Sequence, residues 1–291
     1  MSATLLLSLN LLSGTVIRTD EECLRYQAKT QWQAARKASI AAPEPITDAY
    51  WHALLSCLAS TDSELRDQVG YEALTQLLRN DIPSPAIIVQ LFDILASDIQ
   101  ARADNANQTY LPFAVLGFAE VIRTDRITPH LSPAQRQRAV DLISDYLPNI
   151  HDYRGFSDRD GWRHHVAHSA DVVLQLALNP AINRAQLNTL AEALASQIHN
   201  EYHAFSEGEP YRLARAMVYL MMHPNATMQD KTNWLTAPFS RYEPAKTDSV
   251  HLRQRHNLRF VLLELANLLK GAPEELQQSI LPILNNQLAQ L

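Results

Sequence analysis

Two histidines and an aspartate at helical spacing are the residues of this sequence best suited to chemistry. His164, His168 and Asp171 lie in a segment, Gly161 to Leu178, whose apolar spacing predicts a helix. At about 100° per residue the three side chains fall within roughly 60° of one another. Two histidines four residues apart can chelate Zn²⁺ or another divalent ion, with the carboxylate as a third ligand or as a hydrogen-bond acceptor for a ligand histidine. Alternatively, Asp171 can accept a hydrogen bond from His168 and make it a general acid or base.

The same face also fits a purely structural role. An amphipathic helix turns its polar side to water, and an enclosed His and Asp network can serve only to satisfy its own hydrogen bonds. Val172, Leu174 and Leu176 spread apolar surface around the second half of the helix, which favours enclosure. No Glu follows His164 as in the zinc-protease motif HExxH. The sequence therefore locates a candidate site and leaves its chemistry open.

Two further polar clusters could complete a pocket with these histidines. In the first, Glu209 precedes a proline at a predicted helix start and Arg212 and Arg215 follow it, which gives either local ion pairs or a clamp for an anion. In the second, His256 and Asn257 begin an apolar helix, where such residues either cross-link helices or project into a cavity. If the three clusters share one cavity, Glu209, Arg212 and His256 should lie within hydrogen-bonding reach of the histidine face.

Helices must position these residues, because the chain reads as helices of about 12 to 20 residues separated by short breaks. The predicted ranges are 47–59, 62–79, 85–102, 107–123, 132–147, 160–178, 184–203, 209–222, 227–235, 249–269 and 273–289, with a loop near 237–248. Pro85 and Pro133 stand at helix starts, where the missing amide hydrogen has no effect. Only 7 glycines occur in 291 residues, which disfavours a fold rich in sheet.

Short connections between successive helices make neighbours antiparallel, and many such pairs build a solenoid or a toroid. The stretch DSELRDQVGYEALTQLL places Leu65, Val69, Ala73, Leu74 and Leu77 at helical spacing, like one HEAT-type repeat. No strict sequence period recurs. We therefore expect an all-α fold, an irregular α/α superhelix of HEAT or armadillo type, that forms one domain over residues 21–291.

Charge and hydropathy exclude two classes of partner. The net charge is -6, and no run of Lys or Arg interleaves with aromatic residues, so we expect no nucleic-acid partner. No stretch of about 20 apolar residues occurs, so we expect no integral membrane span.

The N-terminus leaves the compartment open. Residues 1–20 fit either a signal peptide or a first amphipathic helix, because the apolar run lacks a basic start and an Ala-x-Ala cleavage site. Cys23 and Cys57 could join in a disulfide in an exported chain or remain buried thiols in the cytosol.

The pattern D-x-R-G followed by G-W-x-H-x-x-A-H-x-x-D resembles the bacterial domain-of-unknown-function family 2785. It falls on Asp152, Arg154, Gly155, Gly161, Trp162, His164, Ala167, His168 and Asp171, and a later E-x-x-R-L-A segment falls on Glu209, Arg212 and Leu213. The segments LRDQVGYEAL and RHN extend the resemblance from about Cys23 to Leu269. It implies a helical-repeat fold and adds Arg154 and Trp162 to the predicted pocket. It implies no reaction.

The resemblance bears on the compartment and includes one departure. Similar members from Gram-negative bacteria often carry an export signal followed by a Cys, which favours the periplasm over the cytoplasm and a Cys23 to Cys57 disulfide. Many relatives have Arg-Ser-Phe where this chain has Tyr110, Leu111, Pro112 and Phe113. If that arginine belongs to a family site, the site is altered here.

Two functions fit these observations. A curved helical stack with a polar pocket is typical of an interaction or scaffold module that binds a protein or peptide partner. The alternative is an enzyme or small-ligand binder that uses the His164, His168 and Asp171 face, with a divalent metal such as zinc as its cofactor.

Overall fold

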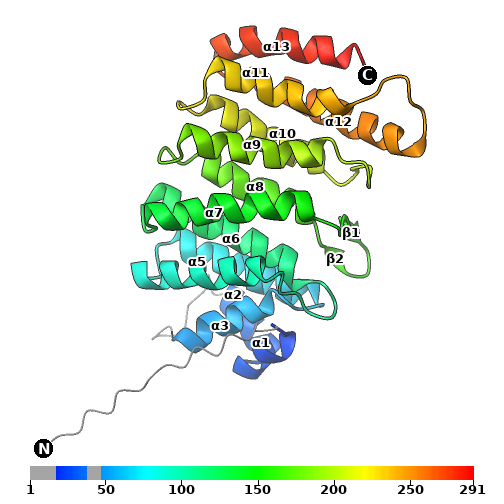
Figure 1. Cartoon of the computed structure of the whole chain (residues 1–291). Coiled ribbons are helices and arrows are strands. Elements are labelled where there is room, and N and C mark those ends of the chain that lie inside the picture. Colours follow the sequence, from blue (N-terminus) through cyan, green and yellow to red (C-terminus); the bar gives the residue numbers. More distant parts are fainter. Residues whose placement is uncertain (1–17, 38–46) are drawn as a thin grey trace, which may run out of the picture.

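The chain is helical throughout the part that the computed structural model describes, residues 18–37 and 47–291 (Figure 1). The helices are α1 (Asp20–Tyr26), α2 (Lys29–Lys37), α3 (Asp48–Cys57), η1 (Glu64–Tyr71), α4 (Glu72–Arg79), α5 (Pro85–Gln100), α6 (Tyr110–Ile127), α7 (Pro133–Tyr146), η2 (Leu147–Asn149), α8 (His165–Ala177), α9 (Arg184–Ile198), α10 (Glu209–Met222), α11 (Met228–Thr236), η3 (Ala237–Arg241), α12 (Ser249–Leu269) and α13 (Glu274–Leu288). Within these ranges the only sheet pairs β1 (Phe156–Ser157) with β2 (Gly161–Trp162). The prediction of an all-α fold is confirmed.

From α4 onward the helices alternate between two rows (Figure 1). In the row that we call the even row, α4 packs on α6, α6 on α8, α8 on α10 and α10 on α12. In the odd row, α5, α7, α9, α11 and α13 contact one another in that order. Fully buried residues such as Val173, Leu190 and Leu213 fill the space between the rows. Helix pairs therefore stack in a repeat-like array, as expected for an irregular α/α superhelix.

Side-chain caps fix where the helices begin. Ser84 and Ser132 accept hydrogen bonds from the backbone amides of Ile87 and Gln135, directly before the prolines that start α5 and α7. These caps satisfy amide groups that have no partner within the helix. The structure thus confirms the predicted starts at Pro85 and Pro133.

The predicted helix over 160–178 is wrong at its start. Gly161 and Trp162 pair with β1, the amide of Arg163 donates to the carbonyl of Gly155 at 2.8 Å, and α8 begins only at His165. Gly161 has φ of 69°, and a Cβ there would lie 2.9 Å from Nη2 of the buried Arg66, so the position needs glycine. The apolar residues keep helical spacing in this part of the sequence, but tertiary contacts hold the segment as a hairpin.

His164 is the residue at the junction of hairpin and helix. It has φ of 62° and ψ of 39°, in the left-handed region that residues other than glycine rarely adopt. Such strain persists only where the surroundings fix it, and it concentrates at functional sites. His164 is therefore held in place by the hairpin rather than by a regular helix.

Other predicted ranges also differ in detail, and the predicted helix 184–203 ends at Ile198. The range 62–79 is divided into η1, which has π-helical hydrogen bonding, and the regular helix α4. Leu65, Val69, Ala73, Leu74 and Leu77 are all buried, as the repeat-like spacing predicts. The predicted loop near 237–248 begins with the 3₁₀ helix η3.

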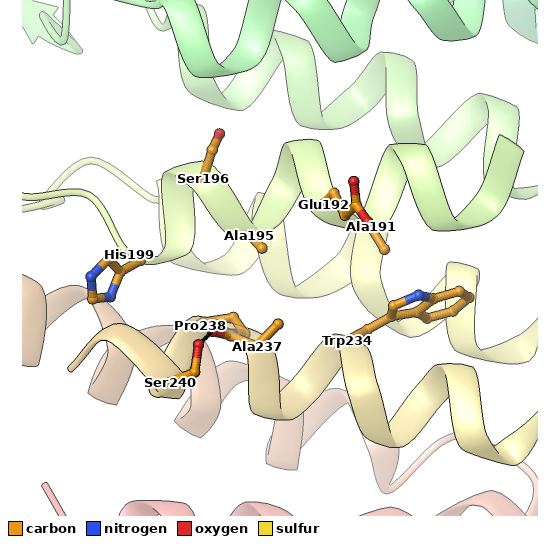
Figure 2. Close-up of a pocket in the computed structure, with 9 residues that line it drawn as sticks. All are labelled: Ala191, Glu192, Ala195, Ser196, His199, Trp234, Ala237, Pro238 and Ser240. Carbon is orange, nitrogen blue, oxygen red and sulfur yellow. Dashed lines mark hydrogen bonds between the residues drawn. The ribbon is translucent and has the colours of Figure 1, made fainter. Parts of the chain in front are cut away.

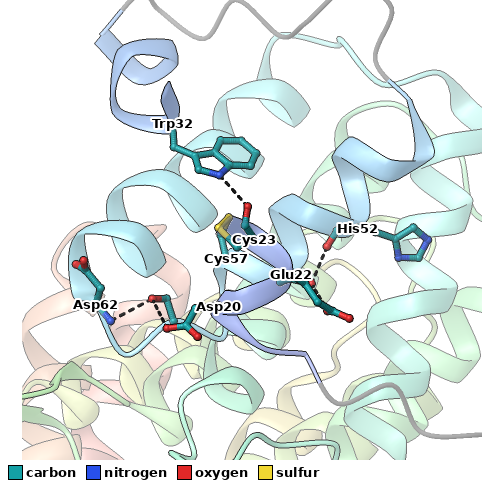
Figure 3. The surroundings of a disulfide bond; sticks show 9 residues. Asp20, Glu22, Cys23, Trp32, His52, Cys57 and Asp62 are labelled. Carbon is teal, nitrogen blue, oxygen red and sulfur yellow. Dashed lines mark hydrogen bonds between the residues drawn. A yellow bond between two sulfur atoms is a disulfide. The ribbon is translucent and has the colours of Figure 1, made fainter. Parts of the chain in front are cut away.

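The first helices are tied to the stack by a disulfide (Figure 3). Cys23 of α1 is bonded to Cys57 of α3, with the Cα atoms 4.9 Å apart, and Trp32 donates its indole N–H to the carbonyl of Cys23 at 3.2 Å. Arg18 donates to Asp98 of α5 at 3.0 Å. Of the predicted segment 1–20, residues 1–17 lie outside the described residues, and the prediction of one domain over 21–291 stays a prediction.

Candidate functional site

An open cleft of about 570 Å³ lies on the even row beside the β1–β2 hairpin. It takes residues from η1, α6, the hairpin, α8 and α10. They are Asp67, Tyr71, Phe113, Leu116, Trp162, His164, His168, Glu207, Gly208, Tyr211, Arg212 and Arg215. A cleft of this size suits a small ligand.

His164 and Glu209 face each other at one side of the cleft. Nε2 of His164 lies 3.6 Å from Oε1 of Glu209, just beyond hydrogen-bond length, and no other group of the described residues hydrogen-bonds to this buried nitrogen. Glu209 is 2 % exposed, and its Oε2 accepts the amide of Glu207 at 2.9 Å. Burial alone would raise the pKa of Glu209, but His164 and the backbone amides of Glu209 and Glu207 hold that pKa below its usual value. A carboxylate is therefore placed to orient His164.

His168 lies one turn further along α8. Its Nδ1 is 2.9 Å from the carbonyl of Pro112 on α6, so Nδ1 carries the hydrogen and donates it. Burial lowers the pKa of His168 well below 6.5, and the neighbouring His164 and Arg212 add to this effect. His168 is thus a neutral imidazole. Its Nε2 holds a lone pair and borders the cleft, and no group of the described residues donates to it.

Asp171 pairs with Arg212 rather than with His168. Nε of Arg212 donates to Oδ1 of Asp171 at 2.8 Å, and Nη2 contacts Oδ2. Burial lowers the pKa of Arg212, and the charge of Arg215 lowers it further. The predicted Asp171 to His168 contact is therefore not made, and the aspartate instead positions an arginine at the cleft.

The predicted zinc ligands are not brought together. The rings of His164 and His168 are 5.9 Å apart, but the Asp171 carboxylate is used by Arg212. Among residues 18–37 and 47–291, no group of three or more His, Cys, Asp or Glu side chains is arranged to hold a metal ion. The ion pair to α10 occupies the predicted third ligand, and the metal site at His164, His168 and Asp171 stays a prediction.

The two pocket residues added by the family resemblance have different positions. Trp162 borders the cleft and stacks on His164, with the ring centroids 4.6 Å apart. Arg154 is exposed and lies outside the cleft lining, where its side chain pairs with Asp152 and its carbonyl accepts the amide of His164 at 3.0 Å. Arg154 shapes the hairpin, and its backbone fixes the strained His164.

His256 and Asn257 also lie outside the cleft. Nε2 of His256 is 3.0 Å from the carbonyl of Phe205, and Oδ1 of Asn257 accepts the amide of Phe205 at 2.9 Å. Nδ2 of Asn257 donates to the carbonyls of Asn200 and His203. These residues cross-link α12 to the segment between α9 and α10. The expectation that His256 reaches the histidine face is wrong, whereas Glu209 and Arg212 do lie beside it.

Several cleft residues were not predicted as site residues. Asp67 and Tyr71 come from η1, and Tyr211 comes from α10. Asp67 accepts a hydrogen bond from Nε of the fully buried Arg66, and the Arg66 guanidinium also lies over the ring of Phe113. A signal for Arg66, Asp67 and Tyr71 existed, because all three lie in the LRDQVGYEAL segment of the family resemblance. Nothing in the sequence alone places Phe113 beside them.

A second cleft of about 530 Å³ lies on the odd row, between α9 and the segment from α11 to η3 (Figure 2). Ala191 and Ala195 form one wall, Trp234 and Pro238 the other, and no predicted site residue lines it. Glu192 and His199 stand apart in Figure 2, so its titratable groups do not converge. The even-row cleft is therefore the better candidate for chemistry.

No described helix has the length and apolar character needed to cross a membrane.

Comparison with known proteins identifies one family. No curated protein and no solved structure matches the chain. Residues 95–266, more than half of the sequence, match the family described as "Protein of unknown function (DUF2785)". The match includes the hairpin, α6, α8 and α10 and leaves out η1 and the disulfide. The chain therefore belongs to the DUF2785 family.

Proposed function

We propose that this protein is a helical-repeat binding protein and that the even-row cleft is its ligand site. The proposal is supported most by His164. Its Nε2 is buried, lies 3.6 Å from the Glu209 carboxylate and has no hydrogen bond within the described chain. Buried polar groups are normally hydrogen-bonded, and catalytic or binding contacts often tighten only when a ligand enters.

The neighbouring groups support the same proposal. His168 directs an acceptor to the cleft, Arg212 and Arg215 bring positive charge, and Trp162 and Tyr211 bring aromatic surface. A small number of polar groups that converge in a largely apolar pocket is typical of small-molecule sites. A flat scaffold surface does not need a strained histidine with an unmatched nitrogen. We therefore favour a small ligand, or the end of a peptide, over an extended protein partner.

Acid–base catalysis is the second candidate, and His168 is the observation that favours it. Because Nδ1 donates to Pro112, the lone pair on Nε2 can accept a proton from a bound molecule. His164, paired with Glu209, would then act as the donor on the other side. A binding protein needs both groups only as hydrogen-bond partners, so turnover of the ligand separates the two candidates.

We further propose that the protein works in an oxidising compartment such as the periplasm. The Cys23 to Cys57 disulfide supports this location, because disulfides persist in exported proteins and are rare in the cytosol.

A ligand screen with one cleft variant tests the proposal. Thermal unfolding of the full chain would be measured against a library of small metabolites, for wild type and for His168→Asn. Asn keeps a donor for the Pro112 carbonyl and removes the imidazole lone pair. The matched control is His251→Asn on α12, which is outside the cleft lining.

We expect a ligand that raises the midpoint of wild type and of His251→Asn but not of His168→Asn. A ligand that stabilises all three proteins equally would bind elsewhere and would contradict the proposal. Turnover of the same ligand by wild type would move the assignment to the catalytic candidate.

A further inference from the structure

The guanidinium of Arg66 is fully buried in η1 and joins separate segments of the chain. Its Nε donates to Asp67 at 2.8 Å, its Nη1 donates to the carbonyl of Ser60 at 3.3 Å, and its Nη2 donates to the carbonyl of Asp160 at 3.0 Å. Asp160 lies in the turn of the β1–β2 hairpin, 94 residues away in the sequence. One buried side chain therefore ties the hairpin to η1 and to the segment before it.

The contact is closely fitted on the hairpin side. A Cβ at Gly161 would lie 2.9 Å from Nη2 of Arg66 and 3.3 Å from the Cβ of Ser63. On the other side, Cζ of Arg66 lies 4.6 Å from the centre of the Phe113 ring on α6. The hairpin turn, η1 and α6 therefore meet at this one guanidinium.

Arg66 does not border the cleft, but its neighbours do. Asp67 and Phe113 contact its guanidinium directly, and Trp162 follows the glycine that packs against it. Trp162 in turn stacks on the strained His164. Any effect of Arg66 on the cleft therefore passes through these neighbours, as in a residue that supports a binding site from behind.

The chemistry of the side chain explains why an arginine suits this position. Burying a charge is costly unless the charge is paired and hydrogen-bonded, and Asp67 and the two carbonyls meet both conditions. An apolar side chain of similar length would fill the volume but would leave both carbonyls without these donors. Well-packed apolar residues often replace a buried ion pair with no loss of stability. The specific contribution of Arg66 is therefore a fixed position for the hairpin.

We propose that Arg66 positions Trp162 and His164 for the ligand of the cleft by fastening the hairpin turn to η1. Without the guanidinium the helical stack still forms, but the hairpin moves away from η1 and the cleft loses the wall that Trp162 and His164 make. This inference rests on the proposed function of the cleft and identifies a residue outside its lining on which binding depends.

Fluorine NMR of the full chain labelled with 5-fluorotryptophan tests the position of Trp162 without any ligand. The chain has 4 tryptophans, so the Trp162 resonance is assigned by its absence in Trp162→Phe. The test variant is Arg66→Met, which keeps the length of the side chain and removes its donors. The matched control is Arg18→Met, because Arg18 is also buried, pairs with Asp98 and lies outside the cleft lining.

We expect both arginine variants to keep the helical circular dichroism signal and to unfold at a lower temperature, because each loses a buried ion pair. Only Arg66→Met should move the Trp162 resonance, towards its position in the urea-unfolded chain. If Arg66→Met does not fold, Arg66→Lys replaces it. Lysine keeps the charge beside Asp67, but its compact ammonium cannot reproduce the fork of donors to Asp67 and both carbonyls.

Two results of this experiment would overturn the proposal. One is a Trp162 resonance that stays at the wild-type position in the folded Arg66 variant. The other is an equal shift of that resonance in Arg18→Met, since the hairpin would then respond to any lost ion pair.

Binding gives the second readout. The probe is the screened metabolite that stabilises wild type but not His168→Asn. Calorimetric titration at a temperature where every variant is folded should show binding weakened at least roughly tenfold in the Arg66 variant and unchanged in Arg18→Met. Wild-type affinity in the Arg66 variant would contradict the positioning role.

The outcomes separate this inference from the proposed function. If no metabolite passes the screen, the proposed function fails, and the Trp162 resonance still decides whether Arg66 fixes the hairpin. If a metabolite binds and is lost in His168→Asn but not in the Arg66 variant, the cleft remains the site and this inference fails.

Discussion

The cleft beside α8 and the cluster of His256 and Asn257 within α12 contain the same kinds of residue and use them differently. Asn257 is fully buried, and both its amide oxygen and its amide nitrogen bond to backbone groups of residues 200–205. His164 is nearly as buried, yet its Nε2 has no hydrogen bond within the described chain. A polar cluster that satisfies itself holds the fold together, whereas one that leaves nitrogens without partners is poised for a ligand. The two clusters differ in whether their buried polar atoms have hydrogen-bond partners, and they do not differ in residue type.

The largest expected effect is on stability, at the α12 cluster. Asn257→Ala removes three hydrogen bonds from a fully buried site and leaves the amide of Phe205 and two carbonyls without partners. We expect the free energy of unfolding to fall by about 3 kcal/mol. Urea denaturation followed by circular dichroism measures this change. A loss below about 1 kcal/mol would mean that the cluster is not the structural cross-link described above.

The next effect concerns pH and His168. Because the folded-state pKa lies well below 6.5, the unfolded chain takes up a proton at this residue as the pH falls through 6.5 while the folded chain does not. The contribution to stability is therefore present above pH 6.5 and is lost as the pH falls towards the folded-state pKa. Between pH 7.5 and 5.5 we expect wild type to lose more stability than His168→Asn, by on the order of 1 kcal/mol. If the free energy of unfolding fell equally with pH in wild type and in His168→Asn, that result would contradict a neutral, buried His168.

A smaller effect is expected for Glu209→Gln. The ionised carboxylate is stabilised by His164 and by backbone amides, so its removal should lower stability by about 1 kcal/mol at pH 7. The stability difference between wild type and Glu209→Gln should be fully present above a pH of about 4.5. It should shrink as the pH falls through the folded-state pKa of Glu209, which is lower. Ligand binding should weaken in the same variant, because His164 loses its orienting partner. Unchanged binding would place the ligand away from His164.

The smallest effect is expected for Arg154→Ala. The pair with Asp152 is exposed on the arginine side, and such pairs contribute little, about 0.5 kcal/mol or less. The backbone contact from Arg154 to His164 remains in the variant. Ligand titration should give wild-type affinity, and a strong loss would show that this side chain reaches the ligand directly.

The sequence predicts the helices well because their signals are local. Caps and prolines place the starts of α5 and α7, and α10 occupies the predicted range 209–222. The sequence left open whether Glu209 and Arg212 make local ion pairs or share a cavity with the histidines; in the structure Glu209 lies 3.6 Å from His164, and Arg212 lines the same cleft.

The parts that the sequence does not predict depend on distant contacts. The hairpin at Gly161 forms against Arg66, nearly a hundred residues earlier in the chain, while the helical spacing of the sequence continues through it. Asp171 turns away from His168 because Arg212 lies on the adjacent helix. His256 lies within α12, eight residues into the helix, and the carbonyl of Phe205, in the segment before α10, takes its hydrogen bond. Each of these contacts joins residues that are far apart in the sequence, so the residues within one helical turn do not predict it.

His168 presents an unprotonated Nε2 to the cleft. Two-dimensional ¹⁵N–¹H NMR of the imidazole nitrogens in the intact protein at pH 7, assigned by comparison with His168→Asn, tests it directly. We expect a neutral ring with its hydrogen on Nδ1 and a chemical shift of Nε2 typical of a bare nitrogen. A hydrogen on Nε2, or a charged imidazolium, would contradict the account.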